Sequence, residues 1–303
     1  MKLRALLLAA IAIPAIAQAK PIPIPAVPPA ALNQPALAEM VKTLSSDDYE
    51  GRAPGTAGAA KTVAYLIERF KAAGLQPGNK GSWTQDVPTV EITANNMAGL
   101  AITGGPGTML FAPGKDFVAG SYRAVDRTAI ADAELVFVGY GINAPELGWN
   151  DYAGVDMKGK VAVILVNDPD YASATEDGPF KGRRMTYYGR WTYKFEEAAR
   201  QGARAALIVH DTFPAAYGWN VVESSWTGAQ YFVQKANKGM DQTEANGWIQ
   251  KPVAEAILKA AGQNLAQLTA AAQQRGFKAV PLGLKASMNF DNTLHTAMSK
   301  NVI

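Results

Sequence analysis

The segment that decides the fold runs from KVAVILVNDPD (160–170) to WTYKFEEAARQGARAALIVHD (191–211). Its first apolar, β-branched run, Val161–Val166, lies between turn residues and predicts a buried strand. Apolar residues in 191–198 follow helical spacing, and Gly202 is suited to end that helix. A second apolar run, Ala205–Val209, predicts another strand. Strand, helix and strand form a βαβ unit, whose two strands should be parallel in a sheet covered on at least one face.

The composition is that of an ordinary globular protein of one large or two smaller domains. Of the 303 residues, 48% are hydrophobic and 18% are charged, and the formal net charge is +3. This balance favours neither a nucleic acid nor an anionic membrane as a partner. The chain has no cysteine, which excludes disulfides, thiolate zinc sites and a cysteine nucleophile. Only two histidines are present, which limits histidine-based chemistry.

The N-terminus has the features of a secretory signal peptide. Lys2 and Arg4 precede the apolar run Ala5–Ile16, and Ala17-Gln18-Ala19 provides a small-residue cleavage site. An uncleaved membrane anchor is the alternative, but the run is shorter than the roughly 20 residues that a spanning helix needs. We predict cleavage after Ala19, a periplasmic or secreted protein, and a Pro- and Ala-rich linker over 20–35.

The first third of the mature chain predicts two helices and a hairpin. Apolar spacing predicts one helix over 37–44 and another over 63–70, the second ending at Gly74 with Leu75 packed back. The Gly/Pro loop Glu50–Thr56 lacks the Gly-x-x-x-x-Gly-Lys pattern of a phosphate cradle, so we interpret it as a turn before a helix. Strands are expected over 83–92, 97–102 and 108–111, the last two joined by Gly104–Gly107. Pro113-Gly114 marks a predicted domain boundary.

The chain after Pro113-Gly114 is predicted to contain strands, helices and long irregular segments. A strand is expected over 135–138, followed by a long loop over 139–156 and then the βαβ unit. The aromatic-rich segment 213–248 is predicted to be mostly irregular, and its rings either pack onto the sheet or form a binding surface. Two short helices over 253–261 and 265–275 precede an alternating, edge-type strand over 284–290.

The candidates for chemistry are isolated side chains. His210-Asp211 follows a strand, a common place for functional groups in α/β sheets, yet neither His210 nor His295 belongs to a His-x-x-x-His or His-x-Asp cluster. We interpret both as strand-end or surface residues. Ser224-Ser225 lacks the glycines of a nucleophile elbow, which argues against a serine hydrolase. The other candidates are three acidic pairs, which turns or solvated faces would also explain, and an aromatic segment suited either to a ligand or to the core: Glu196-Glu197, Asp168 with Asp170, Glu176-Asp177 and Tyr187–Trp191. No catalytic, cofactor-binding or metal-ligating residue is assigned.

The chain resembles a known family over nearly the whole predicted mature sequence. Glu50–Thr56, the helix to Gly74-Leu75 and Trp83-Thr84-Gln85 resemble the N-terminal segment of secreted bacterial zinc aminopeptidases. More specifically, the chain looks like members with an inserted protease-associated (PA) domain. The segments similar to that insert are Leu135–Ile142, Trp149–Tyr152, Val155–Lys160 and Tyr187–Asp211. PA domains also occur in proteins that are not peptidases.

This resemblance implies an α/β fold in which a partial α/β/α zinc-peptidase domain is interrupted by a β-rich PA domain that contains the βαβ unit. The implied organisation is a signal peptide (1–19), a linker (20–35), a peptidase segment (36–112), the PA domain (113–290) and a return into the peptidase domain (291–303). The implied activity is release of N-terminal residues from peptides by water activated between two zinc ions. The family's ligands are a His-x-Asp, an adjacent acidic pair and later Asp and His residues. His210 is followed by Asp211-Thr212 and His295 by Thr296-Ala297, so no ligand is carried over.

Two hypotheses follow. In the first, the chain is the N-terminal part of a zinc aminopeptidase, lacks the metal-ligand region and is inactive and metal-free alone. In the second, it is a stand-alone PA-type module that binds peptides or proteins without catalysis. Peptides are the expected partners in both, and neither a nucleic acid nor, after cleavage of the signal peptide, a membrane is expected.

Overall fold

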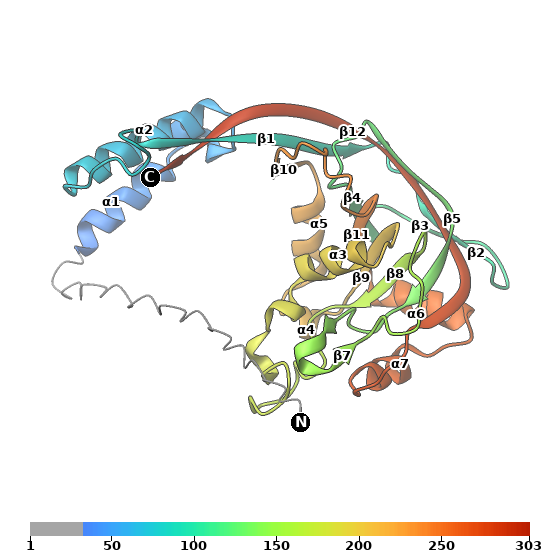
Figure 1. Ribbon diagram of the computed structural model, residues 1–303. Coiled ribbons are helices and arrows are strands. Elements are labelled where there is room, and N and C mark those ends of the chain that lie inside the picture. The colour runs from blue at the N-terminus through green and yellow to red at the C-terminus, as the bar shows by residue number, and fades with distance from the viewer. Residues whose placement is uncertain (1–32) are drawn as a thin grey trace, which may run out of the picture. The chain divides into compact units, whose positions relative to one another are not determined.

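The computed structural model describes residues 33–303, which form two compact units (Figure 1). The first unit ends at Asp48 and the second runs from Tyr49 to Ile303. The predicted signal peptide and most of the predicted linker lie outside the described residues. Among residues 33–303, none of the helices combines the length and the hydropathy that a membrane span requires.

The first unit contains the helix α1(Gln34–Leu44), as its apolar spacing predicts. Asn33 caps this helix, because its side-chain oxygen accepts a hydrogen bond of 3.1 Å from the backbone N–H of Ala36. The predicted linker is therefore too long by two residues, since Gln34 and Pro35 already belong to the helix. Proline is compatible with the first helical turn, where its missing N–H would have no partner in any case.

A 3-10 helix, η2(Asp47–Arg52), leads to the second unit, whose first α-helix is α2(Ala57–Ala72). Thr56 caps α2 by accepting a hydrogen bond of 3.2 Å from the N–H of Ala59. The loop 50–56 is thus a turn that starts a helix, as predicted. Gly74 has φ +78°, and the N–H of Leu75 donates to the carbonyl of Phe70 at 3.1 Å. These features confirm the predicted glycine-based ending of α2.

Ten strands form one mixed sheet in the part of the chain that the structure describes, in the order β10-β1-β12-β5-β8-β9-β11-β4, with β2 beside β12 and β3 beside β2. The four strands β5, β8, β9 and β11 are parallel neighbours, whereas the other pairings are antiparallel. The strand bounds are β1(Thr84–Asn95), β2(Leu100–Thr103), β3(Met109–Phe111), β4(Phe117–Gly120), β5(Arg127–Phe137), β8(Val161–Leu165), β9(Ala205–His210), β10(Ala229–Val233), β11(Ala245–Gln250) and β12(Val280–Val302). A small sheet, β6(Asn143–Ala144) with β7(Trp149–Asn150), lies in the long loop after β5, together with η3(Pro145–Leu147).

The predicted βαβ unit is confirmed. Strands β8 and β9 are parallel, with Val161 opposite Ala205, and every residue of both strands is buried. They are joined through η4(Gly182–Arg184), η5(Tyr187–Gly189) and the helix α3(Trp191–Arg200). Gly202 has φ +80° immediately after the helix, a conformation that glycine adopts without a steric penalty.

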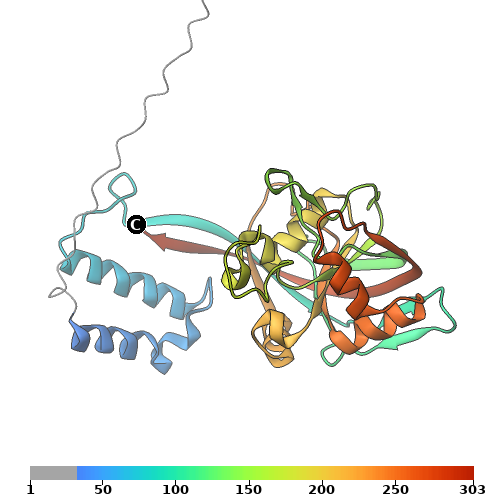
Figure 2. The ribbon, with the colours of Figure 1, turned by 90° about the horizontal axis from the view of Figure 1, so that it is seen from below.

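Helices cover both faces of the parallel strands (Figures 1 and 2). Alternate strand residues, such as Ile164 and Ile208, pack with Phe195 of α3 and with α5(Trp219–Trp226). The intervening residues, such as Val163 and Leu207, pack with the helices α6(Lys251–Ala260) and α7(Leu265–Ala272). The near-continuous apolar runs of β8 and β9 follow from burial on both faces.

Two further sequence predictions are wrong, and one strand was missed. The segment 213–248 is not mostly irregular, because it contains α4(Thr212–Ala215), α5, β10 and β11. Strand β4 was not expected. The segment 284–290 is not an edge strand but the middle of β12, which pairs with β5 on one side and with β1 and β2 on the other. Its alternating pattern reflects one exposed face, which an inner antiparallel strand can also have.

The hairpin of β2 with β3 and the two short helices α6 and α7 are confirmed. Asn264 caps α7 by accepting a hydrogen bond of 3.0 Å from the N–H of Gln267. The domain boundaries at 113 and 290 stay predictions.

Candidate functional site

A cavity of about 380 Å³ lies at the carboxyl ends of β8 and β9, the usual place for a ligand in an α/β sheet. Strand ends, α6 and α7 surround it, and we call it the carboxyl-end cavity. Its lining residues that can form hydrogen bonds or ion pairs are Tyr140, Tyr171, Asp211, Lys251, Glu255, Thr269 and Gln273. The rest of its wall is largely aliphatic.

Two of the three charged residues that line the carboxyl-end cavity, Lys251 and Asp211, form an ion pair. Lys251 donates to Asp211 at 2.7 Å, and this hydrogen bond raises the pKa of Lys251. Burial raises the pKa of Tyr171 further above its usual range, and the neighbouring Asp211 adds to this effect. The cavity therefore holds a paired carboxylate and ammonium, a second carboxylate from Glu255, and neutral phenols.

The two histidines are far apart. His210 ends β9 and is buried, with Nε2 at 3.0 Å from the carbonyl oxygen of Tyr217, and burial lowers its pKa. His295 is exposed on β12, opposite Glu91. In the order of the sheet, β5 and β8 lie between β12 and β9. Among residues 33–303 there is no group of three His, Cys, Asp or Glu side chains that could hold a metal ion.

A buried lysine lies beside the same strand ends. Lys194 of α3 is fully buried, and its Nζ donates to the carbonyl oxygen of Tyr140 at 2.6 Å. Burial lowers the pKa of Lys194, whereas Asp151 and Asp168 favour its charged form. We call Lys194 and these two buried carboxyls, neither of which forms an ion pair with the amine, the Lys194 cluster.

The two carboxylates of the Lys194 cluster fix separate loops. Asp151 accepts from the backbone N–H of Ile142 at 3.0 Å and from Nε1 of Trp149 at 2.8 Å. Asp168 accepts from the N–H and the hydroxyl of Thr186 at 3.2 Å and 3.1 Å through one oxygen, and its Oδ1 has no partner. Burial raises the pKa of both carboxyls to about 6. The cluster ties the loop after β5, the loop after β8 and α3 together.

We expect Asp168 to make stability depend on pH between about 4 and 6. Its pKa is raised from 3.8 to about 6 in the folded chain, so the folded state binds more protons than the unfolded state in this window. Its stabilising contribution is present below pH 4 and is lost as the pH rises through 6. Asp168→Asn should therefore flatten the fall in unfolding free energy from pH 4 to pH 7, measured by urea unfolding. An unchanged slope would contradict a role of Asp168 in this pH dependence.

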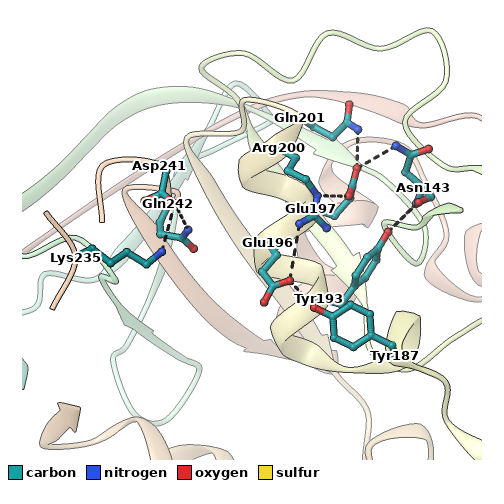
Figure 3. Close-up of polar contacts among 10 residues, drawn as sticks. All are labelled: Asn143, Tyr187, Tyr193, Glu196, Glu197, Arg200, Gln201, Lys235, Asp241 and Gln242. Carbon is teal, nitrogen blue, oxygen red and sulfur yellow. Dashed lines mark hydrogen bonds and ion pairs between the residues drawn. The ribbon is translucent and has the colours of Figure 1, made fainter. Parts of the chain in front are cut away.

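The acidic pair Glu196-Glu197 belongs to a polar network on α3 (Figure 3). Glu197 is buried and accepts from Nε of Arg200 at 2.7 Å and from Nε2 of Gln201 at 2.7 Å. Glu196 accepts from the hydroxyl of Tyr187 at 2.5 Å. Each carboxylate is thus held by neighbours that donate hydrogen bonds, and neither is placed as a free acid or base.

The other sequence candidates have structural contacts. Asp170 accepts from the N–H of Phe180 at 3.0 Å and of Gly182 at 3.1 Å, which fixes the loop before α3. Glu176 forms an exposed ion pair with Arg184 at 2.8 Å. The hydroxyls of Ser224-Ser225 donate within α5 to the carbonyl of its first turn.

Comparisons with known proteins find similar solved structures, among them two bacterial aminopeptidases. No protein-family model matches the chain, and no curated protein matches it. An aminopeptidase from Aneurinibacillus sp. strain AM-1 is 21% identical with a TM-score of 0.41, over 89% of this chain and 47% of that one. BSAP, a zinc aminopeptidase from Bacillus subtilis, is 14% identical with a TM-score of 0.29, over 86% of this chain and 45% of that one. The chain spans less than half the length of both, and similarity at this level does not decide its function.

Sequence reasoning missed Lys194, although a signal was present. Lys194 lies three residues after Trp191 and four before Ala198, on the helix face that the apolar spacing marks as buried. A lysine on such a face needs partners, and Asp151 and Asp168 were available in neighbouring loops. The sequence does not show that these loops meet, because that depends on the parallel order of β5, β8 and β9.

Proposed function

We propose that this chain is the N-terminal part of a secreted or periplasmic zinc aminopeptidase. In this proposal, residues 36–112 and 291–303 belong to the peptidase domain, and residues 113–290 form a PA domain that shapes access of peptides. The activity would be removal of N-terminal residues from peptides. The observation that carries the proposal is the convergence of the PA-like sequence segments on the Lys194 cluster.

That convergence connects segments that are distant in sequence. Asp151, from the segment Trp149–Tyr152, binds the backbone of Ile142, which ends the segment Leu135–Ile142. Lys194, from the segment Tyr187–Asp211, binds the backbone of Tyr140. The residues that carry the resemblance therefore lie together in one buried cluster. This favours a shared architecture over several unrelated chance similarities.

The residues of this chain do not fit a zinc pair. Residues 1–32 contain no His, Cys, Asp or Glu, and residues 33–303 offer no group of three such side chains that could hold a metal ion. In such a reaction, zinc would lower the pKa of a bound water and polarise the carbonyl group of the substrate. In the proposal, the zinc ligands belong to another part of the parent protein.

The second candidate is a PA-type module that binds peptides without catalysis. It is favoured by an open strand edge, β10, which has one sheet neighbour within residues 33–303. The reading frame after Ile303 distinguishes the candidates. A frame that continues into a His-x-Asp and an adjacent acidic pair supports the peptidase, whereas a stop codon directly after Ile303 contradicts it and supports the binding module.

A further inference from the structure

Strand β10 offers backbone groups that lack partners. It pairs antiparallel with β1, and the N–H of Gln234 donates to the carbonyl of Pro88 at 2.9 Å. This hydrogen bond shows which residues bond to β1, namely Gln230 and Phe232 of β10 and Gln234 directly after it. In an antiparallel pair, every second residue bonds the partner strand and the others face away. The N–H and C=O groups of Ala229, Tyr231 and Val233 therefore point away from β1. No backbone partner for them is found within residues 33–303.

This edge lacks the features by which proteins protect exposed strands. Its sequence Ala-Gln-Tyr-Phe-Val contains neither a charge nor a proline, and its register with β1 has no bulge. Tyr231 and Val233 are 38% and 61% exposed. An extended backbone is the group that satisfies such a row of donors and acceptors.

Two cavities lie along one face of β10. Phe232 is opposite Val90 in the ladder, and both side chains line a cavity of about 440 Å³ near the end of the strand. A second cavity, of about 270 Å³, lies near the start of the strand and is lined by Trp191, Trp226 and Gln230 among others. We call the first the lysine cavity and the second the aromatic cavity. Both are lined by Phe232 and Tyr122, whose ring centroids are 4.9 Å apart.

The lysine cavity has a positive charge. Lys235 and Lys238 line it, and no carboxylate does. Lys235 binds Asp241 at 3.3 Å, as Figure 3 shows. Lys238 has no ion pair in the part of the chain that the structure describes, so the cavity joins apolar walls to one ammonium that is available for a carboxylate.

We propose that β10 binds an extended peptide that adds a strand to its free edge, with an apolar side chain at the aromatic cavity and a carboxylate at the lysine cavity. Side chains of an added strand opposite Gln230, Phe232 and Gln234 face the cavities, because residues that lie opposite share a face of the sheet. The apolar residue and the acidic residue are then four positions apart, about 13 Å. This inference deepens the second candidate function, the peptide-binding module, on which it rests, and it is independent of zinc and of the aminopeptidase proposal.

The test uses fluorescent, capped five-residue peptides, Leu-Thr-Val-Thr-Glu and its reverse, Glu-Thr-Val-Thr-Leu, since an added strand can run in either direction. Fluorescence anisotropy with the 303-residue chain in buffer containing EDTA should show saturable binding of at least one peptide. Tyr231→Pro removes an outward N–H without breaking the β1 ladder, and it should weaken binding about tenfold. Tyr231→Ala keeps that N–H and is the matched control.

A double-mutant cycle tests whether Lys238 of the lysine cavity binds the carboxylate of the peptide. Lys238→Ala should weaken binding of the Glu peptide about threefold and leave a Gln analogue unchanged, whereas Lys278→Ala should change neither. Val233→Pro is a second edge variant, should Tyr231→Pro fail to fold by circular dichroism. No binding of either peptide, or equal binding by folded proline variants, overturns the proposal. A dimer that the proline variants dissociate, without peptide binding, also overturns it and assigns the edge to a second copy of the chain.

Discussion

Replacing Lys194 by methionine should lower the free energy of unfolding by about 3 to 5 kcal/mol at neutral pH. Lys194 is fully buried and lies among Asp151, Asp168 and the carbonyl oxygen of Tyr140. Methionine fills nearly the same volume, so the loss arises from charge and hydrogen bonding rather than from a cavity. It leaves the carbonyl oxygen of Tyr140 without its donor, and it removes the amine that favours the charged forms of Asp151 and Asp168; both losses are costly in a buried site.

Urea unfolding followed by circular dichroism measures this loss, and Lys158→Met is the matched control. Lys158 is exposed, so its replacement should change stability by less than about 0.5 kcal/mol. The penalty of Lys194→Met should shrink between pH 7 and pH 5, because both carboxyls have pKa values of about 6 and become neutral. A variant as stable as the parent at pH 7 would show that Lys194 does not hold these loops.

The second large effect is expected for Trp149→Ala, which should cost about 3 to 5 kcal/mol. Trp149 is 5% exposed, and its ring centroid lies 5.1 Å from that of Phe180 in an edge-to-face arrangement. Its Nε1 donates to Asp151 at 2.8 Å. Alanine removes the packing and also leaves that carboxylate oxygen of Asp151 without its donor.

Trp149→Phe separates these two contributions. Phenylalanine keeps most of the ring but has no N–H, so it should cost about 1.5 to 3 kcal/mol, the usual range for a hydrogen bond to a charged group. Thermal unfolding of the three proteins gives the order wild type, Trp149→Phe, Trp149→Ala. Equal destabilisation by both variants would mean that packing contributes nothing beyond the hydrogen bond to Asp151.

Local sequence patterns correctly predicted the helices and strands whose environment is the same along their whole length. Strands β8 and β9 are apolar throughout because helices cover both of their faces, and Gly202 and Gly74 end helices through positive φ angles. Strand β10 was missed because Ala-Gln-Tyr-Phe-Val has no charged residue to mark its exposed side. The segment 284–290 of β12 was mistaken for an edge because its second neighbour, β2, comes from far earlier in the chain, as the pairing of Lys285 with Thr103 shows.

The candidate site was less predictable than the fold. The sequence indicated His210, Asp168 and Glu197 as polar residues near strand or helix ends, but not their partners. Some partners are distant in sequence, such as Asn143 for Glu197, 54 positions away, and Thr186 for Asp168, 18 positions away. The peptide-binding edge that we propose depends on the absence of a neighbouring strand, which no local pattern reports.

The central claim is that the charged residues of this chain serve the fold and do not assemble a zinc site. The most direct test has two parts. The purified 303-residue protein is dialysed against micromolar zinc and its zinc content is measured. Its aminopeptidase activity is then assayed with leucine p-nitroanilide. The account predicts substoichiometric zinc and no turnover above a buffer blank. One or two zinc ions retained per chain together with release of p-nitroaniline would contradict it.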